Sequence, residues 1–136
     1  MSAIQTGTSF HIATTLANMA ERAQPHVLGD YAVDGKAMLG VIRIPRERTG
    51  GFWERHDGGD EILVLLEGRC TMTLRPSEGP EKSHELGPGD ALLIPKGVAH
   101  SGKAHTPEVR VLFITPREGN VEWHDDPARN NVTGHP

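Results

Sequence analysis

The amino-acid sequence predicts a single all-β domain, built as a sandwich or barrel of short strands. The chain has 136 residues, which is enough for one hydrophobic core and too few for two domains of ordinary size. Its 16 glycines and 10 prolines divide it into short segments. Most of these segments either alternate apolar and polar residues or are apolar over a few consecutive positions, as strands do.

The first 25 residues are expected to form an N-terminal arm and a short helix. Residues 1–11 have no clear apolar period. Leu16, Met19 and Ala20 then recur at helical spacing, which predicts a helix from Thr14 to Gln24. A threonine at position 14 or 15 can cap the start of this helix, and Pro25 ends it.

Residues 26–116 are expected to form the barrel, because turn residues there separate segments of strand length. The predicted strands are His26–Val33, Ala37–Ile44, Gly51–His56, Glu61–Leu66, Arg69–Leu74, Ser83–Leu86, Ala91–Ile94, Ala99–Lys103 and Arg110–Thr115. Strands this short favour a sandwich or barrel over alternating strand–helix units. Residues 117–136 are polar and are expected to form a loosely packed tail, with Val121 and Trp123 as its available anchors.

Strand alternation predicts which side chains share a face, because residues two apart in a strand point the same way. Glu54 and His56 therefore lie on one face, and Trp53 lies on the opposite face as a packing or oligomer contact. The segment that follows Glu61 is apolar almost throughout, as in a strand covered on both sides. If Glu61 points inward, the interior is apolar with its polar groups at one end.

Composition and charge argue against several functions. The formal net charge is −4 and no basic run occurs, so nothing indicates a nucleic-acid partner. The longest apolar stretch, Ile62–Leu66, is far shorter than the roughly 20 residues that span a bilayer. No secretory signal is readable at the N-terminus. The single Cys70 excludes an intrachain disulfide, and we interpret it as a buried thiol in a cytoplasmic protein.

Two segments carry histidines and a carboxylate at regular spacing. The first has His56-x4-Glu61-x6-Gly68, and the second has Gly89-x5-Pro95-x-Gly97-x2-His100. Over Ala37–Thr115 the chain resembles the cupin superfamily, whose motifs are G-x5-H-x-H-x3,4-E-x6-G and G-x5-P-x-G-x2-H-x3-N. The second motif is matched except at its end, where Ala104 replaces Asn.

The first cupin motif is matched from its second histidine onward. Glu54 stands where its first histidine belongs, and Arg48 stands in place of its first glycine. The other register makes His56 the first histidine and Gly58 the second, but it leaves the spacing to Glu61 one residue short. We prefer the first register because it leaves the remaining spacings intact.

The resemblance implies a small single-domain cupin, of the kind often called mannose-6-phosphate-isomerase-like, with a jelly-roll barrel that holds a metal ion. Metal-binding cupins use both histidines and the glutamate of the first motif and the histidine of the second. The ligands implied here are His56, Glu61 and His100, with the carboxylate of Glu54 in the fourth position. Two imidazoles and two carboxylates suit a divalent ion such as Mn, Fe, Ni or Zn.

Glu54 has other roles open to it. It can pair with neighbours of Arg55 or with a strand arginine such as Arg43 or Arg110, which leaves two histidines and one carboxylate around the ion. Oxygen-activating non-haem iron enzymes use such a triad, so this arrangement is also compatible with catalysis. If Glu54 is not a ligand, it is the best available general base, because it lies beside the ion.

The fold alone does not identify a reaction, because cupin barrels include many enzymes and also non-catalytic proteins. One hypothesis is a divalent-metal-dependent enzyme, such as an oxygenase or isomerase, that acts on a small oxygenated substrate in the barrel. The other is a barrel that binds or senses a small molecule without turnover. Cupins commonly pair through their edge strands, which implies a homodimer, and His26–Ile44 is the candidate contact. The alternative is that the N-terminal helix packs on the same surface.

Overall fold

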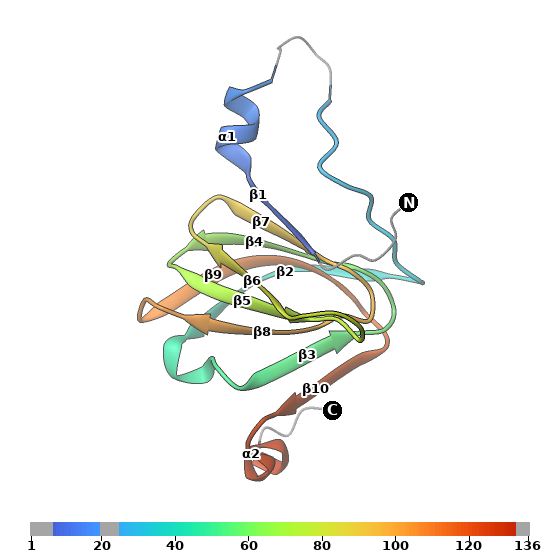
Figure 1. Cartoon of the computed structure of the whole chain (residues 1–136), viewed down its shortest axis with the longest axis vertical. Coiled ribbons are helices and arrows are strands. Elements are labelled where there is room, and N and C mark those ends of the chain that lie inside the picture. The colour runs from blue at the N-terminus through green and yellow to red at the C-terminus, as the bar shows by residue number, and fades with distance from the viewer. Residues whose placement is uncertain (1–6, 20–24, 133–136) are drawn as a thin grey trace.

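Two antiparallel five-stranded sheets face each other in the computed structural model of this protein, which describes residues 7–19 and 25–132 (Figure 1). The first sheet contains, in spatial order, β1 (Thr8–His11), β7 (Asp90–Ile94), β4 (Glu61–Glu67), β9 (Glu108–Pro116) and β2 (Ala37–Pro45). The second contains β10 (Asn120–His124), β3 (Phe52–His56), β8 (Ala99–Ala104), β5 (Cys70–Arg75) and β6 (Lys82–Leu86). This arrangement confirms the expected all-β jelly-roll fold.

The core lies between the two sheets, and strand alternation explains it. Leu65 on β4 and Leu92 and Ile94 on β7 point inward from the first sheet, and Leu74 on β5 points inward from the second. All four side chains are almost completely buried. Burying an aliphatic side chain of this size contributes about 1.5–3 kcal/mol, so these residues hold the two sheets together.

The N-terminal residues contribute a strand that the sequence did not predict. β1 pairs with β7 over all four of its residues, with Thr8 opposite Leu93 and His11 opposite Asp90. His11 Nδ1 lies 2.6 Å from Oδ1 of Asp90, so the two side chains also join the strands. The first sheet therefore begins before residue 26, where the barrel was expected to start.

The short helices differ from those expected. Helix α1 spans Ile12–Ala17, whereas the sequence predicted Thr14–Gln24, of which residues 20–24 lie outside the described part of the chain. A 3-10 helix, η1 (Arg46–Arg48), follows β2, and helix α2 (Pro127–Val132) follows β10. Figure 1 shows α1 beyond β1 at one end of the barrel and α2 beside β10 at the other. No helix in the described residues is long and apolar enough to cross a membrane.

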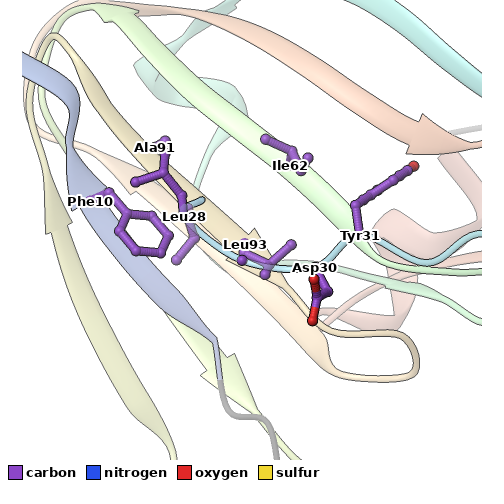
Figure 2. Close-up of a pocket in the computed structure, with 9 residues that line it drawn as sticks. Phe10, Leu28, Asp30, Tyr31, Ile62, Ala91 and Leu93 are labelled. Atoms are coloured by element: carbon purple, nitrogen blue, oxygen red, sulfur yellow. The ribbon is translucent and has the colours of Figure 1, made fainter. Parts of the chain in front are cut away.

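The expected strand His26–Val33 is not formed. Within it, Val33 makes one isolated bridge with Gly59. The segment instead crosses the outer side of the first sheet, where Leu28 and Tyr31 line a pocket with residues of β1, β7 and β4. Figure 2 shows Leu28 beside Phe10 and Leu93 in this pocket. Leu28 and Tyr31 therefore lie against the first sheet, although their segment does not join it as a strand.

The expected C-terminal tail contains the edge strand of the second sheet. β10 pairs with β3 in full register, so that Asn120 lies opposite His56 and Trp123 opposite Trp53. The two indole rings are stacked, with centroids 6.4 Å apart and planes 9° from parallel. Trp53 is buried on the face opposite His56, as strand alternation predicted. The second sheet thus extends past residue 116, where the barrel was expected to end.

Candidate metal centre

Four polar side chains meet inside the barrel where the two sheets approach each other. Glu54 and His56 belong to β3, Glu61 begins β4 and His100 lies on β8. β3 and β8 are neighbours in the second sheet, with Glu54 directly opposite His100. Glu61 belongs to the first sheet, and the turn between β3 and β4 is short, so Glu61 lies close to Glu54 and His56 of the second sheet. One potential ligand atom from each of the four residues lies within 4.8 Å of the other three.

Glu61 lies at the centre of this cluster. Its Oε1 atom is 3.2 Å from Nε2 of His56 and 3.1 Å from Nε2 of His100. Oε1 of Glu54 lies 3.3 and 3.7 Å from the same two nitrogens. The side chains of His56, Glu61 and His100 are at most 5% exposed, whereas that of Glu54 is 33% exposed. Glu54 is therefore the member of the cluster that solvent or a small molecule can reach.

Hydrogen bonds outside the cluster fix the direction of both imidazole rings. Nδ1 of His56 lies 2.8 Å from Oδ1 of Asn120, and Nδ1 of His100 lies 3.2 Å from the main-chain carbonyl of Val98. Both partners accept hydrogen bonds, so both Nδ1 atoms carry a proton and donate. When the rings are neutral, the lone pair of each ring is on Nε2, which faces the carboxylates.

Two buried atoms of the cluster have no hydrogen-bond partner: Nε2 of His56 and Oε1 of Glu61. Thr115 donates to the other oxygen of Glu61 over 2.6 Å, which directs Oε1 toward the imidazoles. A buried polar atom without a partner costs about 1–3 kcal/mol, and a bound ion is one way in which such atoms are satisfied. A metal ion would accept a lone pair from each of these two atoms.

Without an ion, the cluster is held by ion pairs. Burial lowers the pKa of His56, but the nearby carboxylates of Glu54 and Glu61 outweigh burial and raise it to about 10. The same opposing causes raise the pKa of His100 to about 9. Burial raises the pKa of each carboxyl, yet the two imidazoles lower it to about 2. At neutral pH the ion-free cluster therefore contains two imidazolium groups and two carboxylates.

The four donors fit a divalent metal ion in chemistry and in charge. Imidazole nitrogen and carboxylate oxygen are ligands for Mn, Fe, Ni and Zn. Replacing the two imidazolium protons by one divalent cation leaves the total charge of the cluster at zero. This exchange avoids the large cost of placing an uncompensated charge in a buried site.

The structure brings together the four residues that the sequence singled out, and it places the arginines elsewhere. Arg43 and Arg110 both contact the carboxylate of Glu108, at 3.3 and 2.7 Å. The alternative ion pair between Glu54 and one of these arginines is therefore not formed. Glu54 contacts the two histidines instead.

Two residues that support the cluster were not predicted. Thr115 lies at the end of a predicted strand, and its place opposite Glu61 depends on how the strands pair. Asn120 lies in the expected tail. The signal that could have found Asn120 is alternation, because Val121 and Trp123 are apolar and the residues between and beside them are polar.

Comparison with protein families gives one assignment. The model of the Cupin domain family matches residues 40–115, which is more than half of the chain. Among curated proteins, the uncharacterized protein YdbB of Bacillus subtilis (strain 168) is 27% identical over 81 residues, which cover 59% of this chain and 68% of that protein.

Solved structures of oxalate decarboxylases share the fold. The enzyme of Lactobacillus farciminis in its formate complex aligns with a TM-score of 0.54 and 11% identity, covering 88% of this chain and 32% of that one. Bacillus subtilis oxalate decarboxylase, whose Mn(II) centres have been characterised, aligns with a TM-score of 0.53 and 16% identity, covering 63% and 23%. The chain thus spans less than a third of the length of either enzyme. At these identities the likeness shows a common fold.

Proposed function

The chain belongs to the cupin domain family, and on this basis we propose that it is a divalent-metal-dependent enzyme acting on a small oxygenated substrate inside the barrel. The observation that carries this proposal is the buried cluster of Glu54, His56, Glu61 and His100, in which two polar atoms have no hydrogen-bond partner. Mn(II) is the first ion to test, because oxalate decarboxylase of Bacillus subtilis has Mn(II) centres in this fold.

In the proposed centre each side chain has a separate task. His56, Glu61 and His100 are almost completely buried and would hold the ion, with their directions set by hydrogen bonds to Asn120, Thr115 and Val98. When bound, the ion would supply Lewis-acid polarisation of a substrate oxygen. The apolar side chains between the sheets would exclude water from this oxygen.

Glu54 is proposed as the fourth ligand, with proton transfer as its alternative role. Its oxygen lies near both imidazole nitrogens, and its lowered pKa keeps it a carboxylate, as a ligand must be. Its exposure also makes it the group best placed to exchange a proton with a substrate. A Glu54→Gln variant separates the roles: a ligand role predicts lost metal affinity, whereas a proton-transfer role predicts bound metal without turnover.

A barrel that binds or senses a small molecule without turnover is the second candidate. The observation in its favour is that four protein donors surround one point and three of them are almost completely buried. Such a set leaves less room for substrate than a catalytic centre with an open position. Substrate-free protein with a water bound to its metal ion would favour the enzyme, and a closed four-ligand shell would favour the binding protein.

Removal of one imidazole tests the metal centre itself. Protein purified without added metal is expected to carry close to one equivalent of a divalent ion, and His100→Ala is expected to lose most of it, because His100 supplies a buried ligand atom. Metal content by mass spectrometry is the measurement. His105→Ala is the matched control, because His105 is half exposed and contacts Thr71 away from the cluster. Equal metal content in wild type and His100→Ala would overturn the proposal.

We also propose that the protein forms a homodimer through β2. This strand is the edge of the first sheet, and its side chains Leu39 and Val41 are 73% and 69% exposed. They lie within the segment His26–Ile44, which was the candidate contact. Antiparallel pairing of β2 with its copy would satisfy the free backbone groups of both edges and cover these aliphatic side chains.

Val41→Glu is expected to convert this dimer to a monomer, because it would place a carboxylate from each copy in the apolar contact without a counter-ion. Size-exclusion chromatography with light scattering measures the change. Leu16→Glu is the control, since Leu16 is 63% exposed but lies on α1, outside the candidate contact. A wild-type protein that is monomeric at micromolar concentration would refute the dimer.

A cytoplasmic location is also proposed. Its support is Cys70, which is buried in β5 and whose pKa is raised to about 11, first by burial and then by Glu85. A thiol of this kind is protected from reaction and needs no disulfide partner. Fractionation of the source cells tests the proposal.

A further inference from the structure

Asn120 supports the candidate metal centre from a strand that lies outside the segment matched by the Cupin domain model. That segment ends at residue 115, and β10 begins at Asn120, opposite His56 on β3. Oδ1 of Asn120 lies 2.8 Å from Nδ1 of His56, and Nδ2 of Asn120 donates to the carbonyl of Pro116 over 3.0 Å. The amide of Asn120 therefore bridges the end of β9 and the ring of His56.

The contact with Pro116 decides which way round the amide lies. A main-chain carbonyl only accepts hydrogen bonds, so the NH2 group of Asn120 must face Pro116. Oδ1 is then the atom that faces His56, and it accepts a hydrogen bond from Nδ1. With that proton fixed on Nδ1, the neutral ring can offer only Nε2 to an ion, and Nε2 is the nitrogen that faces Glu61.

Asn120 differs in kind from the group that holds the other imidazole. His100 Nδ1 contacts the main-chain carbonyl of Val98, which is present whatever the side chains. For His56, the group that accepts the hydrogen bond from Nδ1 is a side chain, the amide of Asn120. Of the two imidazoles, His56 is therefore the one whose direction a single substitution outside the cluster can change.

Other contacts keep β10 in place without the side chain of Asn120. The amide of Asp57 donates to the carbonyl of Gly119 over 2.9 Å, and Trp123 is stacked on Trp53. A Cβ atom added at Gly58 would lie 2.3 Å from the carbonyl oxygen of Glu118, which shows how closely the turn before β4 packs on the turn before β10. Truncating Asn120 should therefore leave the strand paired.

We propose that Asn120 is a positioning residue that completes the metal centre by orienting His56 and keeping its Nε2 lone pair available to the ion. This inference rests on the proposed function, because it requires that the cluster binds a metal. Partners of metal-bound histidines of this kind typically change metal affinity 10–100-fold.

The test is the Mn(II) dissociation constant of purified full-length protein, measured by competition with a chelator. Asn120→Ala is expected to weaken binding about 10–100-fold. Asn120→Asp is expected to bind more tightly than Asn120→Ala, because a carboxylate still accepts a hydrogen bond from Nδ1 although it loses the bond to Pro116. Val121→Ala, a neighbour whose side chain points to the other face of β10, is expected to bind as wild type does.

The two proposals fail in different ways. Wild-type protein that binds no Mn(II), Fe(II), Ni(II) or Zn(II) would overturn the metal centre and this inference with it. Wild-type binding with no loss in Asn120→Ala would overturn only the inference, as would an equal loss in Asn120→Ala and Asn120→Asp. If Asn120→Ala is unfolded by circular dichroism, Asn120→Leu, which keeps the volume without an acceptor, takes its place in the comparison.

Discussion

Metal affinity is expected to fall about one-hundredfold for each unit of pH decrease between about pH 8.5 and 5. Without metal, His56 and His100 have pKa values raised to about 10 and about 9, so both are protonated over this range. An ion must displace both protons, and each displaced proton contributes a factor of ten per pH unit. Glu54 and Glu61, with pKa values of about 2, stay ionised and do not compete.

The sign of this effect follows from the direction of the two imidazole shifts. Raised pKa values extend proton competition upward, so affinity should keep rising until the pH passes about 9 to 10 and then level off. Chelator competition at pH 6, 7 and 8 gives the slope, and calorimetry in buffers of different ionisation enthalpy gives the number of protons released. His105→Ala should show the same slope. Affinity that does not change between pH 6 and 8 would mean that the imidazoles are neutral before the ion binds.

Gly68→Ala is expected to destabilise the fold by about 2–4 kcal/mol. Gly68 has φ +91°, a conformation that costs a residue with a Cβ atom roughly 1–2 kcal/mol. An added Cβ would also lie 2.5 Å from the carbonyl oxygen of Glu108 and 2.7 Å from Oγ1 of Thr106. The start of β9 would have to move away from the turn before β5. Chemical denaturation measures the loss as a lower midpoint.

Gly79→Ala separates the two contributions to this loss. Gly79 has nearly the same backbone conformation, with φ +96°, but no atom lies within 4 Å of an added Cβ. Its substitution should cost only the conformational part, roughly 1–2 kcal/mol. If both variants lose the same stability, close packing at Gly68 is not the reason for its glycine.

Alternation along single strands predicted much of the candidate site. Because Glu54 and His56 are two residues apart, they share a face, and Trp53 lies on the other one. The meeting of Glu61 and His100 with them depends on pairing between distant segments, which local periodicity does not encode. The spacings of the family motifs supplied that information. The partner of Glu54 among histidines and arginines was settled only by the register of β3 against β8.

The elements missed by the sequence have identifiable physical causes. In β10 the usual alternation is reversed, because polar Asn120 shares the face of β3 that carries His56 while Trp123 packs outside, so the segment resembles a polar tail. β1 is short and mostly polar, and it is held by pairing with β7. In His26–Val33, Leu28 and Tyr31 lie against the outer side of a sheet. Apolar side chains can cover a sheet in this way without forming a strand of it.

The stacked indoles give the protein an intrinsic optical reporter. Trp53 and Trp123 are the only tryptophans in the 136-residue chain, and they lie on β3 and β10, so all tryptophan emission comes from the seam where the last strand docks. Trp53 directly precedes Glu54 on β3, so the indole pair lies one residue along the strand from a member of the candidate metal centre. Undocking of the last strand would separate the two chromophores and abolish their coupled near-ultraviolet signal, which makes the attachment of this strand visible without any label.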